Sequence, residues 1–212
     1  MSQSGQRDAL RFFGRISASV SHEIKNVFAV INESAGLIED LTLMAERGMP
    51  VPPERLQKAA HSIQGQIRRG DAIVKNMNAF AHSTDEENRE VDLVDLVELI
   101  VALSRRMADM KQVGLTAGDL EPVAVVANPF DLMRLLHSSM EAALDAMSPG
   151  DALAVGVKPA PDGALFTLSA GGKPAPRVDG GSLTAMAQSM GMAIEIGEDG
   201  GALTMRFGAP EA

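Results

Sequence analysis

The sequence predicts an α+β protein in which a long helical hairpin precedes a smaller α/β sandwich. In roughly the first 80 positions, apolar residues recur at intervals of three and four, which is the spacing of a helix that buries one stripe. After residue 90 the pattern changes to short apolar runs that alternate with amphipathic helical segments and with turns rich in glycine and proline. The 212 residues are enough for one medium domain or two small ones.

The first helix is expected from Arg7 to Arg47. Its apolar residues form a heptad stripe in which steps of three and four alternate. The stripe consists of Ile16, Val20, Ile24, Val27, Ile31, Ile38 and Leu41, with Ser34 in one position. Residues 48–53 are rich in glycine and proline and end this helix, and Pro53 is placed to begin the next one.

The second helix is expected from Glu54 to His82, and Gly65 and Gly70 weaken it locally. It carries a second apolar stripe at similar spacing. That stripe consists of Leu56, Ala60, Ile63, Ile67, Val74, Met77 and Ala81. Two helices joined by a short turn cannot enclose both stripes by themselves. We therefore predict a homodimer in which two hairpins form a four-helix bundle.

The chain beyond the polar linker at residues 83–89 is expected to form a layered α/β sandwich. Asn128 is placed to cap a helix. The Gly- and Pro-rich residues 170–181 are expected to form a loop. The expected elements are the helices 91–110, 131–147 and 182–190 and the strands 123–126, 152–157, 164–169, 193–196 and 202–207.

The composition excludes several classes of function. The chain has no cysteine, which excludes disulfides, thiolate chemistry and cysteine-based metal sites. Its four scattered histidines have no suitably spaced partners, so we expect no metal site. No apolar stretch approaches the length of a membrane span, and the N-terminus has no signal-peptide core. We therefore expect a cytoplasmic protein without a membrane partner.

The acidic residues are concentrated in the second half of the chain. Residues 1–89 hold 11 Lys and Arg and 11 Asp and Glu, whereas residues 90–212 hold 8 and 17. The second half therefore accounts for the entire net charge of −9. Because an acidic surface repels polyanions, nucleic acid is not expected as a partner.

The segment SHEIKN, residues 21–26, lies inside the first expected helix. At 100° per residue, His22 projects about 160° away from the apolar stripe, and Asn26 lies within about 40° of His22. His22 is therefore expected to face solvent. An exposed histidine followed at once by Glu23, with Asn26 one turn further on, suggests an imidazole that carries a phosphoryl group.

Two cations are candidates for contacts with the phosphate or a partner. Lys25 and Arg15 lie about 60° or less from the direction of His22 and would favour an incoming phosphate. The remaining histidines, His61, His82 and His137, are expected to be structural or surface residues.

These residues resemble the transmitter core of sensor histidine kinases. The resemblance rests on SHEIKN, on IVKNMNAFAH at the end of the second helix and on EVDLVDLVELI after the linker, and it covers nearly the whole chain. It implies that His22 is phosphorylated, that Glu23 polarises the imidazole, and that Asn26 positions a water that dephosphorylates the partner. The family usually has proline at the next position, where Val27 stands here.

The second half resembles the ATP-binding domain of that family in outline but lacks its nucleotide contacts. In NPFDLMRLLHSSMEAALDAM, Ser138 and Ala142 align with two asparagines of the family, and Ala142 cannot ligate Mg²⁺ in place of the second. In SAGGKPAP, Ala170 stands where an aspartate would read adenine. The glycine-rich lid is reduced to residues 179–184. These three losses together predict that the chain does not bind Mg-ATP.

The remaining pattern resembles the kinase-derived histidine phosphotransferases, which shuttle phosphoryl groups between response-regulator receiver domains. On this interpretation residues 1–87 form the dimerisation and phosphotransfer domain, and residues 88–212 form a reduced GHKL-like domain without a nucleotide site. The protein would need no cofactor of its own, since the receiver supplies Mg²⁺. The expected partners are a receiver domain, a second copy of the chain and an upstream hybrid sensor kinase.

Three other functions remain open from the sequence. The protein could be a soluble histidine kinase with a divergent ATP site. It could be a pseudokinase that binds a regulator or a sensor kinase without passing phosphate. It could also be a receiver phosphatase that uses Asn26.

Overall fold

The structure of the protein, a computed structural model, describes residues 3–85, 88–160, 163–170, 173–174, 180–189 and 205–206. The chain forms two compact units. One unit is residues 17–78. The other combines residues 1–16 with residues 79–212. The ends of both hairpin helices therefore group with the α/β part of the chain. The sequence predicts a different division, between a phosphotransfer domain that ends at residue 87 and a second domain that begins at residue 88. That functional division stays a prediction.

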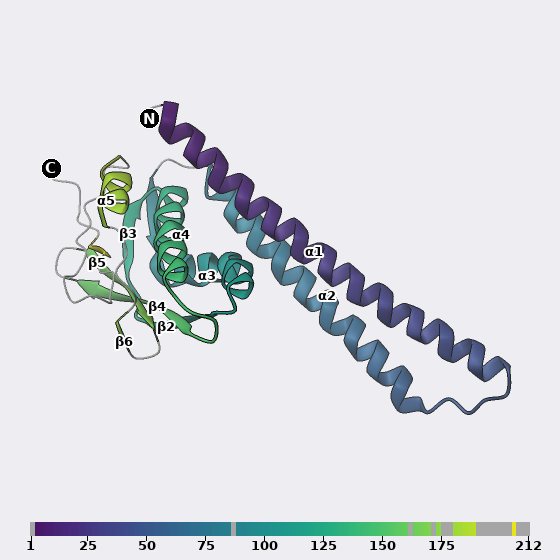
Figure 1. Ribbon diagram of the computed structural model, residues 1–212. Coiled ribbons are helices and arrows are strands. Elements are labelled where there is room, and N and C mark those ends of the chain that lie inside the picture. The colour runs from purple at the N-terminus through teal and green to yellow at the C-terminus, as the bar shows by residue number, and fades with distance from the viewer. Residues whose placement is uncertain are drawn as a thin grey trace. The chain divides into compact units, whose positions relative to one another are not determined.

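Helices α1 (Gln3–Glu46) and α2 (Pro53–His82) form the hairpin (Figure 1). Glycine ends α1, because Gly48 has a φ of 74°, a left-handed conformation that costs glycine little. The Gly48 N–H donates to Ala45 O at 2.9 Å, and the Met49 N–H donates to Met44 O at 3.1 Å. This pair of bonds is a Schellman motif, which satisfies carbonyls left open at the end of the helix.

The apolar stripe predicted for α1 lies on its inner side within the unit of residues 17–78. Val27 and Leu41 are buried, and Ser34 is buried in the polar position of the stripe. The Ser34 hydroxyl donates to Ser62 Oγ of α2 at 3.0 Å. A Cβ added at Gly70 of α2 would lie 3.5 Å from Val27 Cγ1, so the two helices are in van der Waals contact at this level.

The stripe predicted for α2 is only partly used within one chain. Ile63, Met77 and Ala81 are half-buried, but Ala60 is exposed, and Leu56, Ile67 and Val74 keep between 38% and 50% of their surface exposed. Ala59, which lies outside the predicted stripe, is buried instead. Leu56, Ile67 and Val74 belong to the stripe that the sequence assigns to a second copy of the chain. Formation of the four-helix bundle stays a prediction.

The α/β unit contains two sheets. Strands β1 and β3 pair antiparallel in the smaller sheet. In the larger sheet β2 pairs parallel with β4, β4 pairs antiparallel with β5, and β5 pairs antiparallel with β6 and β7. The elements are β1 (Arg89–Asp92), α3 (Leu93–Met110), β2 (Gly114–Leu120), β3 (Ala124–Ala127), α4 (Pro129–Asp145), β4 (Ala152–Ala160), β5 (Gly163–Ala170), β6 (Lys173–Pro174), α5 (Gly180–Ser189) and β7 (Met205–Arg206).

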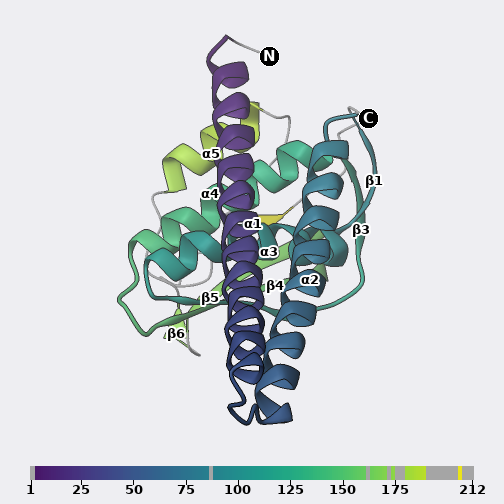
Figure 2. The same cartoon turned by 90° about the vertical axis from the view of Figure 1, so that its right-hand side faces the viewer.

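Helix α3 packs against β2, β4 and α4, and α5 packs against α4. Figures 1 and 2 show α4 between α3 and α5. Alternate residues of β4 and β5 are buried and form the aliphatic core with residues of the helices. The most deeply buried of them include Ile100, Leu136, Met140, Leu153, Val155, Val157, Phe166 and Leu168.

The fold class is the predicted one, a helical hairpin followed by an α/β sandwich, but several boundaries differ. The helix expected from residue 91 begins at Leu93, because residues 89–92 form β1 and the Asp92 side chain caps the helix by accepting from Val94 N at 2.8 Å. Asn128 caps α4 as predicted and accepts from Asp131 N at 3.0 Å.

Strands β1 and β2 are not predicted by the sequence pattern. In β2, Leu115 is the only fully buried residue, so the strand lacks the alternating pattern on which strand prediction depends. The expected strand 193–196 lies outside the described residues, and of 202–207 only residues 205–206 are described, as β7. Of the expected loop at 170–181, residues 173–174 form β6. None of the described helices combines the length and apolar character needed to cross a membrane.

Candidate functional site

His22 lies near the middle of α1, within the unit of residues 17–78, and its side chain is exposed. Ala18, Asn26 and Ala29, on the same face of the helix, are also exposed. Their side chains are short or medium in length, which leaves the imidazole accessible to a second protein. The apolar stripe on the opposite side of the helix maintains this orientation, because turning His22 inward would expose Val27 and its neighbours.

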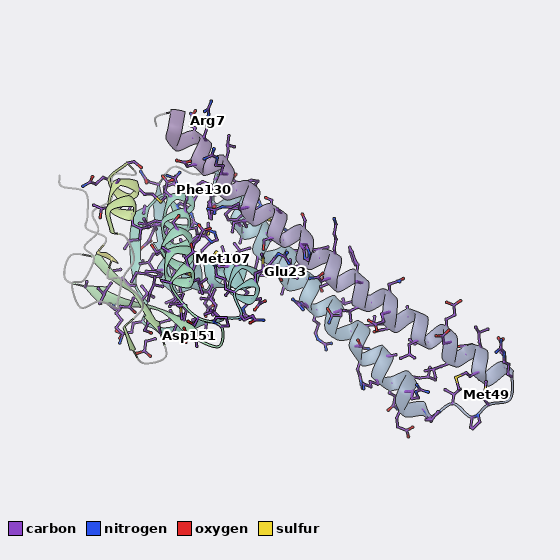
Figure 3. The ribbon with its side chains drawn as sticks, in the orientation of Figure 1. Arg7, Glu23, Met49, Met107, Phe130 and Asp151 are labelled. Carbon is purple, nitrogen blue, oxygen red and sulfur yellow. The ribbon has the colours of Figure 1, made fainter. Side chains whose placement is uncertain are left out.

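Glu23 is turned toward the second helix of the hairpin. Its carboxylate Oε2 lies 3.6 Å from Nη2 of Arg69 in α2. The Glu23 side chain is only 19% exposed, whereas that of Arg69 is 55% exposed. Figure 3 labels Glu23 on α1. The residue next to the candidate phosphoacceptor is thus an ion-pair partner of α2.

The sequence did not indicate that Arg69 of α2 contacts Glu23. It identified the residues of α1 that share the face of His22, but the residue of α2 that meets Glu23 depends on the register between the two helices. Gly70 of α2 lies against Val27 of α1 in that register, and the sequence indicates this glycine only as a weak point of the helix.

Lys25 and Arg15, the two cations predicted near the phosphate, have different environments. Lys25 is exposed on α1. Arg15 groups with the α/β unit, where its Nη1 donates to Glu141 Oε1 of α4 at 2.7 Å. The sequence did not predict this ion pair. Contacts of Lys25 and Arg15 with phosphate stay predictions.

The positions that correspond to the two family asparagines lie in α4. Ser138 and Ala142 are both half-buried and stand one turn apart. Arg134 lies one turn before Ser138 and is buried, with its Nη1 3.6 Å from Asp131 Oδ1. Burial raises the pKa of Asp131 above its ordinary value, and the nearby Arg134 acts in the opposite direction. This stretch of α4 therefore presents a buried guanidinium, a hydroxyl and a methyl group.

The two other positions of the expected nucleotide site lie on β5 and α5. Ala170 is half-buried at the end of β5. Of the residues aligned with the lid, 180–184 form the first half of α5, and 179 lies outside the described residues. Leu183 and Ala187 of α5 are buried. Within the described part of the chain, no group of three or more His, Asp or Glu residues could hold a metal ion.

A cluster of aromatic side chains, here called the aromatic cluster, joins the ends of the hairpin helices to α4. Its members are Phe12 and Phe13 of α1, Phe80 of α2, and Phe130 and His137 of α4. The ring centroid of Phe12 lies 5.5 Å from that of Phe80, 5.4 Å from that of Phe130 and 5.2 Å from that of His137. Phe130 is labelled in Figure 3. All five residues belong to the same compact unit.

His137 is a structural residue of this cluster. It is 4% exposed, and a hydrogen bond of 3.0 Å joins its Nδ1 to Ser104 Oγ of α3. Burial, and secondly the positive charge of Arg15, lower the pKa of His137 from 6.5 to about 4. His61 and His82 are exposed, and His82 Nδ1 lies 2.8 Å from Asp85 Oδ2. His61, His82 and His137 thus have the structural or surface positions expected for them.

Several solved structures that match the chain are described as histidine kinases. They include the histidine kinase AdeS of Acinetobacter baumannii, at 14% identity over 90% of this chain and 98% of that chain with a TM-score of 0.48. The histidine kinase ThkA in complex with the response regulator TrrA matches at 18% identity over 96% of this chain and 64% of that chain, with a TM-score of 0.47.

A structure described as a bacterial phosphotransferase matches at 17% identity over 96% of both chains, with a TM-score of 0.46. No protein-family model matches the sequence, and no curated protein matches it.

Proposed function

We propose that the protein is a histidine phosphotransferase of a two-component phosphorelay and that His22 carries the phosphoryl group. The observation that carries this proposal is the exposed His22 of the SHEIKN segment, held outward on a two-helix hairpin. A phosphoryl carrier needs an accessible ring nitrogen and a rigid support, and the transfer itself depends mostly on positioning and charge neutralisation.

The step is a transfer between aspartate and histidine. The lone pair of the unprotonated ring nitrogen of His22 attacks the phosphorus of an aspartyl phosphate on a receiver domain. The P–N bond forms as the acyl P–O bond breaks, and the receiver aspartate leaves as a carboxylate with the electron pair. The other ring nitrogen keeps its proton. In the onward step a carboxylate oxygen of a second receiver attacks, and the electron pair of the P–N bond returns to the ring. The receiver supplies Mg²⁺ in both steps.

Three observations favour a carrier over an ATP-dependent kinase. Ala142 offers no oxygen to a magnesium ion. Glu141, the neighbouring carboxylate, is engaged by Arg15. The segment aligned with the nucleotide lid begins a helix that packs against α4 and buries Leu183. Under this proposal an upstream hybrid sensor kinase provides the phosphoryl group.

The decisive experiment follows phosphate on the full-length chain. Phosphoramidate, a small donor with a P–N bond, should label the wild type as phosphohistidine, and His22→Ala should abolish this label. His61→Ala removes an exposed histidine of α2 and serves as the matched control, which should label normally. Labelled chain should then pass the phosphoryl group to receiver domains from the same genome. Labelling of His22→Ala, or failure of every receiver to exchange phosphate with the wild type, would refute the proposal.

The same experiment with labelled ATP tests the alternative of an active kinase. Incorporation of label into the wild type but not into His22→Ala would favour the kinase. If phosphorylated receivers lose phosphate faster with the wild type than with Asn26→Ala, and His22 never becomes labelled, the receiver phosphatase is the better description.

We also propose that the working form is a homodimer. The half-exposed Leu56, Ile67 and Val74 follow heptad spacing along α2, and a second hairpin would cover them. Ile67→Lys should therefore shift the protein from dimer to monomer in sedimentation experiments, because it places a charge in the apolar stripe. Gln64→Lys introduces the same charge at an exposed polar position of α2 and should leave the dimer intact. A monomeric wild type, or an unchanged dimer in Ile67→Lys, would contradict the proposal.

A further inference from the structure

The hairpin places a guanidinium at the level of the candidate phosphoacceptor. Arg69 of α2 meets Glu23, which directly follows His22 in α1. Consecutive residues of a helix are separated by only 1.5 Å along the axis. Arg69 is therefore within about one residue of the height of His22, although 46 positions separate Arg69 from Glu23 in the sequence.

The packing below His22 holds Arg69 at this height. Gly70 has no side chain. A Cβ added there would lie 3.5 Å from Val27 Cγ1, which is ordinary van der Waals contact. Further along the hairpin, the hydrogen bond between Ser34 and Ser62 adds a second fixed point of the register. Both contacts belong to the same alignment of α1 and α2 in which Arg69 meets Glu23.

The ion pair between Glu23 and Arg69 is a weak candidate for a stabilising role. The 3.6 Å separation is longer than a hydrogen bond, and more than half of the Arg69 side chain is exposed. Exposed ion pairs of this kind contribute little to folding. A guanidinium has five N–H donors in a planar fork that suits two oxygens of a phosphoryl group. Because the Arg69 side chain is 55% exposed, a second molecule can reach it from solvent.

We propose that Arg69 is a positioning residue for phosphotransfer at His22, an inference that rests on the proposed function. In the resting protein Arg69 holds Glu23. When a phosphoryl group is transferred to or from His22, the guanidinium turns to its oxygens and offsets their negative charge. Arg69 keeps its proton throughout, because an arginine side chain does not deprotonate in proteins. The bonds made and broken are those of the aspartate–histidine transfer alone.

The two cations identified from the sequence fit this role less well. Arg15 donates to Glu141 within the α/β unit. Lys25 is an exposed point charge without the planar fork. Arg69 combines the fork and the exposure with a contact to Glu23, the residue that follows His22.

The test measures transfer rates in both directions between the full-length chain and a receiver domain that exchanges phosphate with the wild type. Arg69→Ala should slow transfer by about a hundredfold to a thousandfold, the range typical of losing one donor to a developing oxyanion. Arg69→Lys keeps the charge without the fork and should recover only part of the rate. Arg68→Ala removes the adjacent exposed cation and is the matched control, which should transfer at the wild-type rate.

A double-mutant cycle with Glu23→Ala separates direct positioning from a merely structural role. If Arg69 acts on the phosphoryl group, Arg69→Ala slows transfer with or without Glu23. If it acts only by holding Glu23, it has no effect in the Glu23→Ala background, and the proposal is overturned. Equal rates for Arg69→Ala and Arg68→Ala would overturn it too. Labelling of Arg69→Ala by phosphoramidate should persist, and loss of label in the wild type would instead refute the proposed function itself.

Discussion

The middle of the hairpin and the aromatic cluster use opposite physical means to place a histidine. His22 is exposed, has alanines on its face, and stands beside a partly solvated ion pair. His137 is buried among phenylalanines and tied to a serine hydroxyl. The first arrangement leaves the imidazole exposed to solvent. The second keeps the ring neutral and makes it part of the core. The chemistry of each imidazole thus follows from its packing rather than from the residue type.

The largest expected effect is a contrast between two phenylalanines of the hairpin helices. Phe80 is 0% exposed at the end of α2, whereas Phe28 is 63% exposed on α1. Phe80→Ala should lower the free energy of unfolding by about 3–5 kcal/mol, because it leaves a cavity in the aromatic cluster. Phe28→Ala should change it by no more than about 0.5 kcal/mol in a single chain. Urea unfolding measures both, and equal losses would contradict the contrast between the two regions.

A smaller effect is expected from the buried imidazole as the pH falls. In the unfolded chain His137 binds a proton below pH 6.5, whereas in the folded protein it does so only near pH 4. The folded state is therefore fully favoured above pH 6.5 and loses stability as the pH falls toward 4. Between pH 7 and pH 5 the loss attributable to His137 is about 2 kcal/mol.

Urea unfolding of the wild type and of His137→Gln at both pH values isolates this contribution, since all other groups titrate in both proteins. His61→Gln is the control and should keep the wild-type dependence. Arg15→Ala should weaken the dependence, because the charge of Arg15 helps to lower the pKa of His137. If His137→Gln loses as much stability as the wild type between the two pH values, the pKa of His137 is not lowered.

The sequence predicted what is periodic and local. The stripe of α1 follows from its spacing, and the outward position of His22 follows from the stripe. The cap at Asn128 follows from residue type and from the proline after it. These features depend on neighbours within one or two turns, so a sequence alone carries the necessary information.

What the sequence did not predict depends on tertiary contacts. Phe12, Phe80 and Phe130 belong to three helices, and no local pattern indicates that their rings meet. The ion pairs of Arg15 with Glu141 and of Arg69 with Glu23 likewise depend on how helices align. Strand β2 was missed because its pattern of burial is too weak. The helical face of the site could thus be predicted, but not the contribution of α2.

Both hairpin helices continue without a break across the boundary between the two compact units. Residues 16 and 17 are both within α1, and residues 78 and 79 are both within α2. Excising residues 17–78 would cut both helices in the middle. Each new helix end would leave up to four amide or carbonyl groups without an intrahelical hydrogen bond. The protein is therefore not modular at this boundary. A chimaera that replaces the α/β part would therefore also have to replace the adjoining turns of α1 and α2, which include Phe12 and Phe80.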